Sequence, residues 1–123
     1  MTGTPPSVGV DIVEIARVGS VLRKHDRRFL ARVYTAGEIG HCRGRVSELA
    51  ARFAGKEAVL KALGTGLRGV GWREVEILPD RRGKPHVYLH GRAQERARLL
   101  GLVHFAISLS HSRDFAVAFV VAT

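Results

Sequence analysis

Apolar side chains recur with a helical period through the middle of the chain. Four of them share one face of a helix at this spacing: Leu49, Phe53, Leu60 and Leu63. Ser47 is of a type that caps the start of a helix, and Gly64 is of the type that ends one. We therefore predict a central helix that is capped by Ser47 and runs to Leu63.

Three charged residues of this predicted helix lie in or beside the apolar face. Lys56 projects near its middle, while Glu57 and Lys61, four residues apart, lie side by side at its margin. In one interpretation, Glu57 and Lys61 form an ordinary surface ion pair and Lys56 extends past its neighbours into water. In the other, these charges and the turn Gly64-Thr65-Gly66 bind a phosphorylated ligand. A carboxylate then needs a bridging cation such as Mg²⁺ and a second acidic residue.

A short β-branched segment near the start of the chain, residues 8–13, predicts a strand that an acidic residue interrupts. Side chains alternate along a strand, so Val10 and Ile12 share one face while Asp11 points to the other. An acid in the middle of a strand is disfavoured, and it is costly if it is buried without a partner. Either this is an edge strand with Asp11 in water or in a salt bridge, or Asp11 has a metal-binding or catalytic role.

The remaining periodic segments predict short helices in the first half and strands mainly in the second. Helices are expected at residues 14–25, from the capping box Thr35–Glu38 to near Gly44, and at 92–100, with a short amphipathic segment at 29–33. Strands are expected at 74–78 and 86–90, joined by a turn, and at 104–110 and 115–121 as an antiparallel hairpin. This order indicates an α+β fold.

The size and composition of the chain limit its class. We expect one domain spanning residues 1–123, large enough for a core yet small enough for a cleft to require a second subunit. No apolar run approaches the roughly 18 residues of a membrane span, and the N-terminus lacks a signal pattern, so we expect a cytoplasmic protein with no membrane contact. Cys42 is the only cysteine, which excludes an internal disulfide and a cysteine-based zinc cluster.

The chain is strongly basic. Twenty Lys and Arg against eleven Asp and Glu give a formal charge of +9, which indicates a polyanionic partner such as nucleic acid, an acidic protein or a phosphorylated small molecule. Arg17 and Arg28 belong to a basic group on the helix at 14–25 and its exit, which is either a solvated face or a docking patch. The few aromatic residues are not interleaved with basic ones, which disfavours a small RNA-binding protein.

Three polar residues gather where the strand at 104–110 ends: Ser110, His111 and Ser112. They are turn formers that satisfy local backbone groups, or they bind a phosphate through hydroxyl and imidazolium donors. The remaining histidines are scattered singly and lack a spacing typical of metal ligands, so we expect no metal site built from them.

Taken together, three blocks of sequence resemble one family. They are residues 9–17 (GVDIVEIAR), 52–66 (RFAGKEAVLKALGTG) and 108–112 (SLSHS) with 116–118 (AVA). This combination is similar to the holo-acyl-carrier-protein synthases, the small bacterial type of 4′-phosphopantetheinyl transferase, and the likeness spans nearly the whole chain. The resemblance implies that family's fold, an antiparallel sheet packed against a long helix, and a homotrimer whose three sites lie between subunits.

The resemblance also implies an activity and its catalytic residues. The family transfers 4′-phosphopantetheine from coenzyme A to a serine of apo-acyl carrier protein and releases adenosine 3′,5′-bisphosphate. Asp11 and Glu57 match the acids that hold Mg²⁺ on the pyrophosphate of coenzyme A, and Lys61 matches the lysine that contacts the phosphates. Either Glu57 or a water on the metal takes the serine proton, as a hypothesis.

The same resemblance implies two sets of binding residues. The residues implied for coenzyme A are Arg52, Lys56, Lys61, Gly64, Thr65, Gly66 and His111. Of these, His111 matches the residue near the 3′-phosphate of the nucleotide. Arg17 and Arg28 fall where the family docks the acidic helix of the carrier protein. We expect no nucleic acid partner.

Overall fold

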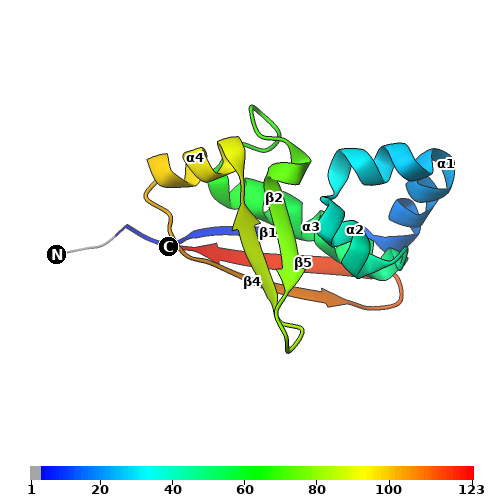
Figure 1. Ribbon diagram of the computed structural model, residues 1–123. Helices are drawn as coiled ribbons and strands as arrows, with labels where there is room; N and C mark the ends of the chain where they lie inside the picture. The colour runs from blue at the N-terminus through cyan, green and yellow to red at the C-terminus, as the bar shows by residue number, and fades with distance from the viewer. Residues whose placement is uncertain (1–3) are drawn as a thin grey trace.

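The computed structural model describes residues 4–123 of the chain (Figure 1). Its helices are α1 (Ile15–Val33), α2 (Ala36–Cys42), α3 (Val46–Leu63), the 3-10 helix η1 (Trp72–Glu74) and α4 (Gly91–Leu99). Its strands are β1 (Ser7–Glu14), β2 (Val75–Pro79), β3 (Pro85–Leu89), β4 (Phe105–His111) and β5 (Phe115–Ala122). Within residues 4–123, no helix combines the length and the apolar character that a bilayer crossing requires.

Two antiparallel sheets confirm the predicted α+β class. Strands β1, β5 and β4 form one sheet in that order, and β2 and β3 form the second, a hairpin. Ala118 of the central strand β5 pairs with Asp11 on one side and with Leu109 on the other. Strand β1 is therefore an edge strand of its sheet, and Asp11 lies in its middle.

Helix α3 packs against one face of the three-stranded sheet. Strand β1 approaches the helix so closely that a Cβ at Gly9 would overlap the carbonyl oxygen of Ala58. The side chains of Ala54, Ala58 and Ala62 are buried, which lets the helix and the sheet lie close together. Helices α1 and α2 lie at one end of the sheet, and α4 and the C-terminus lie at the other (Figure 1). This close packing fixes the positions of the residues of α3 relative to those of β1.

The opposite face of the three-stranded sheet is apolar along β1 and β5. Because side chains alternate along a strand, Val8, Val10 and Ile12 point away from α3, and they are 54%, 55% and 62% exposed. Phe115 and Phe119 of β5 are exposed in the same alternation. None of the elements between residues 4 and 123 covers this outer sheet face, which is defined by these five residues. An apolar surface of this kind marks an interaction site.

The start of α3 differs from the prediction. The helix begins at Val46, its N-cap residue is Arg45, and Ser47 lies inside the first turn, so the predicted Ser47 cap is wrong. The Arg45 side chain instead donates to the carbonyl oxygens of His41 and Cys42, at 2.7 and 2.9 Å. These bonds tie the last turn of α2 to the first turn of α3 and start the helix earlier than the cap pattern predicts.

The boundaries of α1 and α2 follow the prediction more closely. The φ of 27° at Asp26 breaks α1 between the predicted helix and the predicted amphipathic segment. The capping box is confirmed, because the Thr35 side chain accepts from Glu38 N and the Glu38 carboxylate accepts from Thr35 N. Cys42 is buried, and burial raises the pKa of its thiol to about 11, as suits an unreactive structural thiol.

Candidate active site

Asp11 and Glu57 line the same cavity, which has a volume of about 590 Å³ and which we call the acidic cavity. Asp11 enters from β1 and Glu57 from the middle of α3. Burial raises the pKa of Glu57, the negative charge of Asp11 raises it further, and the positive charge of Lys61 partly opposes them. Two acids far apart in the sequence therefore lie close enough to repel each other.

Lys61 joins these acids from the next turn of α3. Its ammonium lies 3.2 Å from Asp11 Oδ1 and donates to the carbonyl oxygen of Val10 at 2.9 Å. The interpretation of Glu57 and Lys61 as an ordinary surface ion pair is therefore wrong, because Lys61 pairs with Asp11 of strand β1. The second carboxylate oxygen of Asp11, Oδ2, is buried and has no hydrogen-bond partner among the described residues. A buried oxygen in this state is suited to a cation or a water.

The two carboxylates fit Mg²⁺ better than a transition metal. Within the described part of the chain, no group of three or more His, Cys, Asp or Glu side chains is placed to hold a metal ion. Mg²⁺ needs only one or two protein carboxylates, because waters and ligand phosphates complete its shell. The unpartnered Oδ2 of Asp11 and the partly buried carboxylate of Glu57 are hard oxygen donors of the required kind.

The rest of the acidic cavity is mainly apolar. Its apolar wall consists of Ile12, Val13, Val18, Val21, Phe29, Phe53 and Phe115. Arg17 of α1 is exposed and lines the same cavity, whereas Arg28 is exposed on α1 beyond the kink at Asp26. Arg17 is therefore the predicted docking residue that lies beside the predicted catalytic acids.

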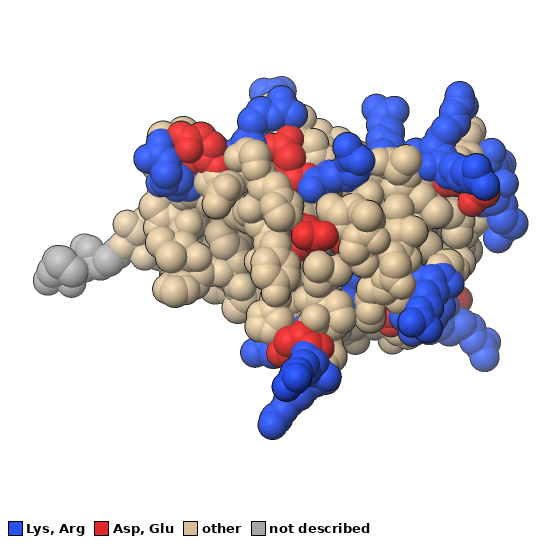
Figure 2. All heavy atoms as spheres, in the orientation of Figure 1, with Lys and Arg blue, Asp and Glu red and all other residues tan. Residues whose placement is uncertain are grey.

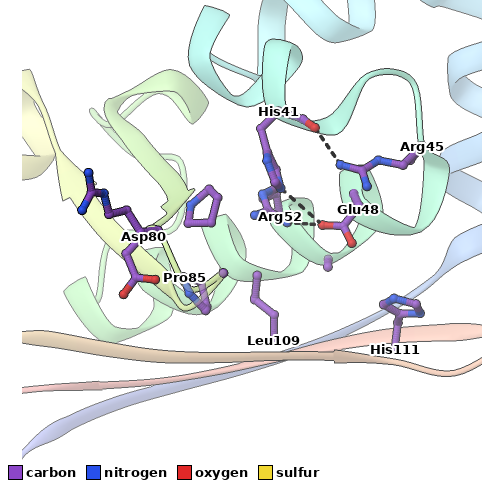
Figure 3. Close-up of a pocket in the computed structure, with 12 residues that line it drawn as sticks. His41, Arg45, Glu48, Arg52, Asp80, Pro85, Leu109 and His111 are labelled. Atoms are coloured by element: carbon purple, nitrogen blue, oxygen red, sulfur yellow. Dashed lines mark hydrogen bonds and ion pairs between the residues drawn. The ribbon is translucent and has the colours of Figure 1, made fainter.

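A second cavity brings together Arg52 and His111 (Figure 3). It has a volume of about 500 Å³, and we call it the arginine cavity because Arg45, Arg52 and Arg81 line it. The Arg52 guanidinium is buried and donates through Nη1 to Glu48 Oε1 at 2.7 Å. His111 lies at the end of β4 and is exposed. This cavity has the cations that a phosphate needs.

Lys56 belongs to the lining of neither cavity, which argues against the predicted contact with coenzyme A. Its side chain is fully buried, and its ammonium lies 2.7 Å from Glu38 Oε1, which is equally buried. It also donates to the carbonyl oxygens of Trp72 and Val75. These three partners use all three N–H donors of the ammonium, so Lys56 neither reaches water nor has a donor left for a ligand.

The predicted glycine turn ends α3 at Leu63, two residues after Lys61. Gly64 has a φ of 74° and Gly66 a φ of 55°, both in the left-handed region that favours glycine. The Gly64 N–H donates to the carbonyl oxygens of Leu60 and Lys61, and Thr65 N–H donates to Leu60 O. The turn therefore adjoins Lys61, but it belongs to the lining of neither the acidic cavity nor the arginine cavity.

Some lining residues were missed by sequence reasoning. Glu48 precedes Arg52 by four residues, so the helical period alone contains the signal for their ion pair. His41 and Arg45 come from α2 and the start of α3, and Arg81 comes from the turn between β2 and β3. No local pattern joins these segments, because the cavity forms only when they pack together.

Comparisons with known proteins show which family the chain belongs to. A model described as the 4′-phosphopantetheinyl transferase superfamily matches residues 7–120. A holo-[acyl-carrier-protein] synthase from Herpetosiphon aurantiacus is 49% identical over 120 residues, covering 92% of this chain and 94% of that protein. A protein of the same name from Moorella thermoacetica is 46% identical over 113 residues, covering 89% and 88% of the two chains.

Solved structures match the fold as well. The holo-[acyl-carrier-protein] synthase from Helicobacter pylori, in complex with coenzyme A, has a TM-score of 0.87 and 31% identity, and the match covers 94% of this chain and 99% of that one. The enzyme from Neisseria meningitidis has a TM-score of 0.88 and 35% identity, with 95% and 97% covered. The chain therefore belongs to the 4′-phosphopantetheinyl transferase superfamily and, within it, to the holo-acyl-carrier-protein synthases, a family of transferases. This membership overturns the alternative of an RNA-binding protein without catalysis.

Proposed function

We propose that this chain transfers 4′-phosphopantetheine from coenzyme A to a serine of an acyl carrier protein in a Mg²⁺-dependent reaction that releases adenosine 3′,5′-bisphosphate. The observation that supports it best is that Asp11 and Glu57 come from two elements to line one cavity, with Lys61 paired to Asp11. Two carboxylates can hold a Mg²⁺ ion, and that ion together with the Lys61 ammonium would neutralise the charge of a diphosphate.

In this proposal Asp11, Glu57 and Lys61 each have a role of their own. Asp11 and Glu57 would hold Mg²⁺, which supplies the positive charge that neutralises the pyrophosphate of coenzyme A. The side chain of Lys61 is 54% exposed, so its ammonium can turn from Asp11 and donate to the leaving phosphate. Glu57 is also a candidate acceptor for the serine proton, because burial and Asp11 raise the pKa of its carboxyl.

The nucleotide of coenzyme A would bind in the arginine cavity, with Arg52 and His111 as phosphate ligands. Arg52 and Glu57 are five residues apart on α3, so their side chains point roughly 140° apart around the helix axis. A ligand that contacts both the arginine cavity and the acidic cavity is therefore best placed between two copies of the chain. This placement supports the proposal that the enzyme is a homotrimer. The glycine turn Gly64-Thr65-Gly66 would then line the cleft next to Lys61.

The apolar outer sheet face supports the same proposal. A surface of Val8, Val10, Ile12, Phe115 and Phe119 is unfavourable in water, and a second copy of the chain would remove it from solvent. The enzyme would be cytoplasmic, as the sequence predicts.

The carrier protein would dock on the basic end of the molecule. Lys and Arg side chains gather at the end formed by α1 and α2 (Figure 2). The exposed basic residues of α1 include Arg17, Arg23, Lys24, Arg27 and Arg28. Arg17 would hold the acidic partner next to the acidic cavity, so that its serine enters beside Asp11 and Glu57.

The test is incubation of the purified protein with apo-acyl carrier protein, coenzyme A and Mg²⁺, followed by mass spectrometry of the carrier. The expected result is a mass gain of roughly 340 Da, which is one phosphopantetheine group covalently attached. A carrier variant with alanine at the modified serine is the control and should gain nothing. An unmodified wild-type carrier after complete incubation would refute the proposal.

A further inference from the structure

The arginine cavity contains a carboxylate where an anion would be expected to bind. Glu48 Oε1 lies 2.7 Å from Arg52 Nη1 and 3.8 Å from His41 Nε2, and the three side chains line the cavity together (Figure 3). The Glu48 side chain is 28% exposed, whereas that of Arg52 is 5% exposed. The most deeply buried cation of the cavity is therefore already paired with a negative charge of the chain itself.

His41 does not neutralise that negative charge at neutral pH. Burial and the positive charge of Arg52 lower the pKa of His41 more than Glu48 raises it. His41 therefore stays uncharged, and Arg52 remains the close cationic partner of Glu48. Arg45 directs its guanidinium to the carbonyl oxygens of His41 and Cys42 instead.

Arg52 keeps binding capacity while it is paired. Its Nε is buried and has no hydrogen-bond partner in the described chain. A guanidinium has five N–H donors in a fixed plane, and a phosphate binds it best through two of them at once. Glu48 occupies Nη1, so a phosphate that approaches Arg52 must share the guanidinium with a carboxylate or displace it.

We propose that Glu48 is a built-in competitor of the nucleotide phosphates for Arg52, and that it weakens the binding of coenzyme A and of the bisphosphate product. This inference rests on the proposed function, because it takes the arginine cavity as the nucleotide site. The Glu48 carboxylate and a bound phosphate are both negative, so they repel each other when they share Arg52. This repulsion raises the free energy of the nucleotide-bound protein and is absent from the free protein. Weaker binding favours release of the product after each transfer.

The test compares two variants that each remove one negative charge. Glu48→Gln keeps an oxygen that can accept from Arg52, so the guanidinium stays in place while the charge is lost. Glu95→Gln is the control for the loss of one negative charge, because Glu95 forms an exposed ion pair with Arg98 on α4 and lies outside the arginine cavity. Thermal unfolding of both variants establishes that each is folded.

Binding of adenosine 3′,5′-bisphosphate is measured by titration calorimetry at low salt. We expect Glu48→Gln to bind roughly two- to fivefold more tightly than the unsubstituted protein, as for the loss of one partly exposed charge interaction, and Glu95→Gln to bind as the unsubstituted protein does. A merely structural role for Glu48 predicts the opposite sign, because a disturbed Arg52 binds phosphate more weakly. Equal or weaker binding by Glu48→Gln would overturn the inference about Glu48 and leave the proposed nucleotide site standing. Absence of binding by every protein would overturn it together with the nucleotide assignment.

Discussion

The ammonium of Lys61 on α3 lies 3.2 Å from the carboxylate of Asp11 on β1. This pair joins two elements that are fifty residues apart in sequence, and it neutralises one of the two acids of the acidic cavity. The Asp11 oxygen that Lys61 leaves free, Oδ2, has no other partner among the described residues. A cation can therefore approach the pair of acids without first breaking the Lys61 contact.

Lys61→Met should lower kcat while the fold stays intact. The substitution keeps a long side chain but removes the charge that would stabilise the leaving phosphate, and loss of one such donor costs roughly 100-fold in rate. The check is the steady-state rate of carrier modification, with circular dichroism as a control for folding. Lys61→Arg keeps the charge and should retain more activity than Lys61→Met. An unchanged kcat in Lys61→Met would remove Lys61 from the catalytic set.

Asp11→Asn should lower the pKa of Glu57. In the unsubstituted chain, burial raises that pKa first and the charge of Asp11 raises it further, so removal of the second cause leaves a smaller rise. The measurement is a carbon-13 NMR titration of the Glu57 carboxyl in metal-free protein. An unchanged titration curve would show that the two acids do not face each other.

Glu57→Gln should abolish transfer and yet stabilise the fold at neutral pH. A carboxyl with a raised pKa binds its proton more tightly in the folded chain than in the unfolded one, so its contribution to stability is present at low pH and is lost as pH rises through the folded pKa. Above that pKa the ionised Glu57 destabilises the fold, and glutamine removes the charge. Thermal unfolding at several pH values checks this, and the difference in Tm between variant and parent should shrink as pH falls.

The sequence predicted the elements well because their signals are local. The helical period around α3, the alternation in β1, β4 and β5 and the capping box at Thr35 each extend over a few neighbouring residues. Lys56 was misplaced for the opposite reason. Its position within the apolar stripe was correct, but its partner Glu38 comes from α2, and no periodicity shows which side chain faces it.

The candidate site was predictable only in part for the same reason. Asp11 and Glu57 stood out because an acid is unusual in a strand or beside an apolar stripe, and they line one cavity. The arginine cavity was hidden because it needs α2, α3, β4 and the turn after β2 to pack together. Arg52 was chosen by resemblance alone, and His111 both by resemblance and as part of the polar turn after β4. Glu48 and Arg81 were not chosen at all.

Lys56→Met should destabilise the chain. The protein that remains folded should have an unchanged KM for coenzyme A. The substitution leaves the fully buried carboxylate of Glu38 without its cation, and breaking a buried pair in this way costs about 3–5 kcal/mol. The double variant Glu38→Gln with Lys56→Met should lose less than the sum of the two single variants. Denaturant unfolding measures all three. A raised KM in a variant with normal stability would instead favour a ligand contact.

Arg17→Glu should raise the KM for the carrier protein by roughly tenfold and leave the KM for coenzyme A unchanged, because it reverses one charge on the proposed docking face. Arg98→Glu on α4 is the control, since Arg98 is exposed at the other end of the molecule. Initial rates at varied concentrations of each substrate separate the two effects. Equal changes in both KM values would show that α1 does not hold the carrier.

Phe119→Arg should dissociate the oligomer, because it places a charge in the middle of the outer sheet face. Tyr88→Arg is the matched control, since Tyr88 and Phe119 are each 47% exposed and Tyr88 lies on the other sheet. Light scattering after size exclusion should give three times the chain mass for the parent and for Tyr88→Arg, and one chain mass for Phe119→Arg. If the acidic and arginine cavities of neighbouring copies form one site, the monomer also loses transfer activity, although both cavities remain folded within each chain. A fully active monomer would show that one chain binds coenzyme A alone.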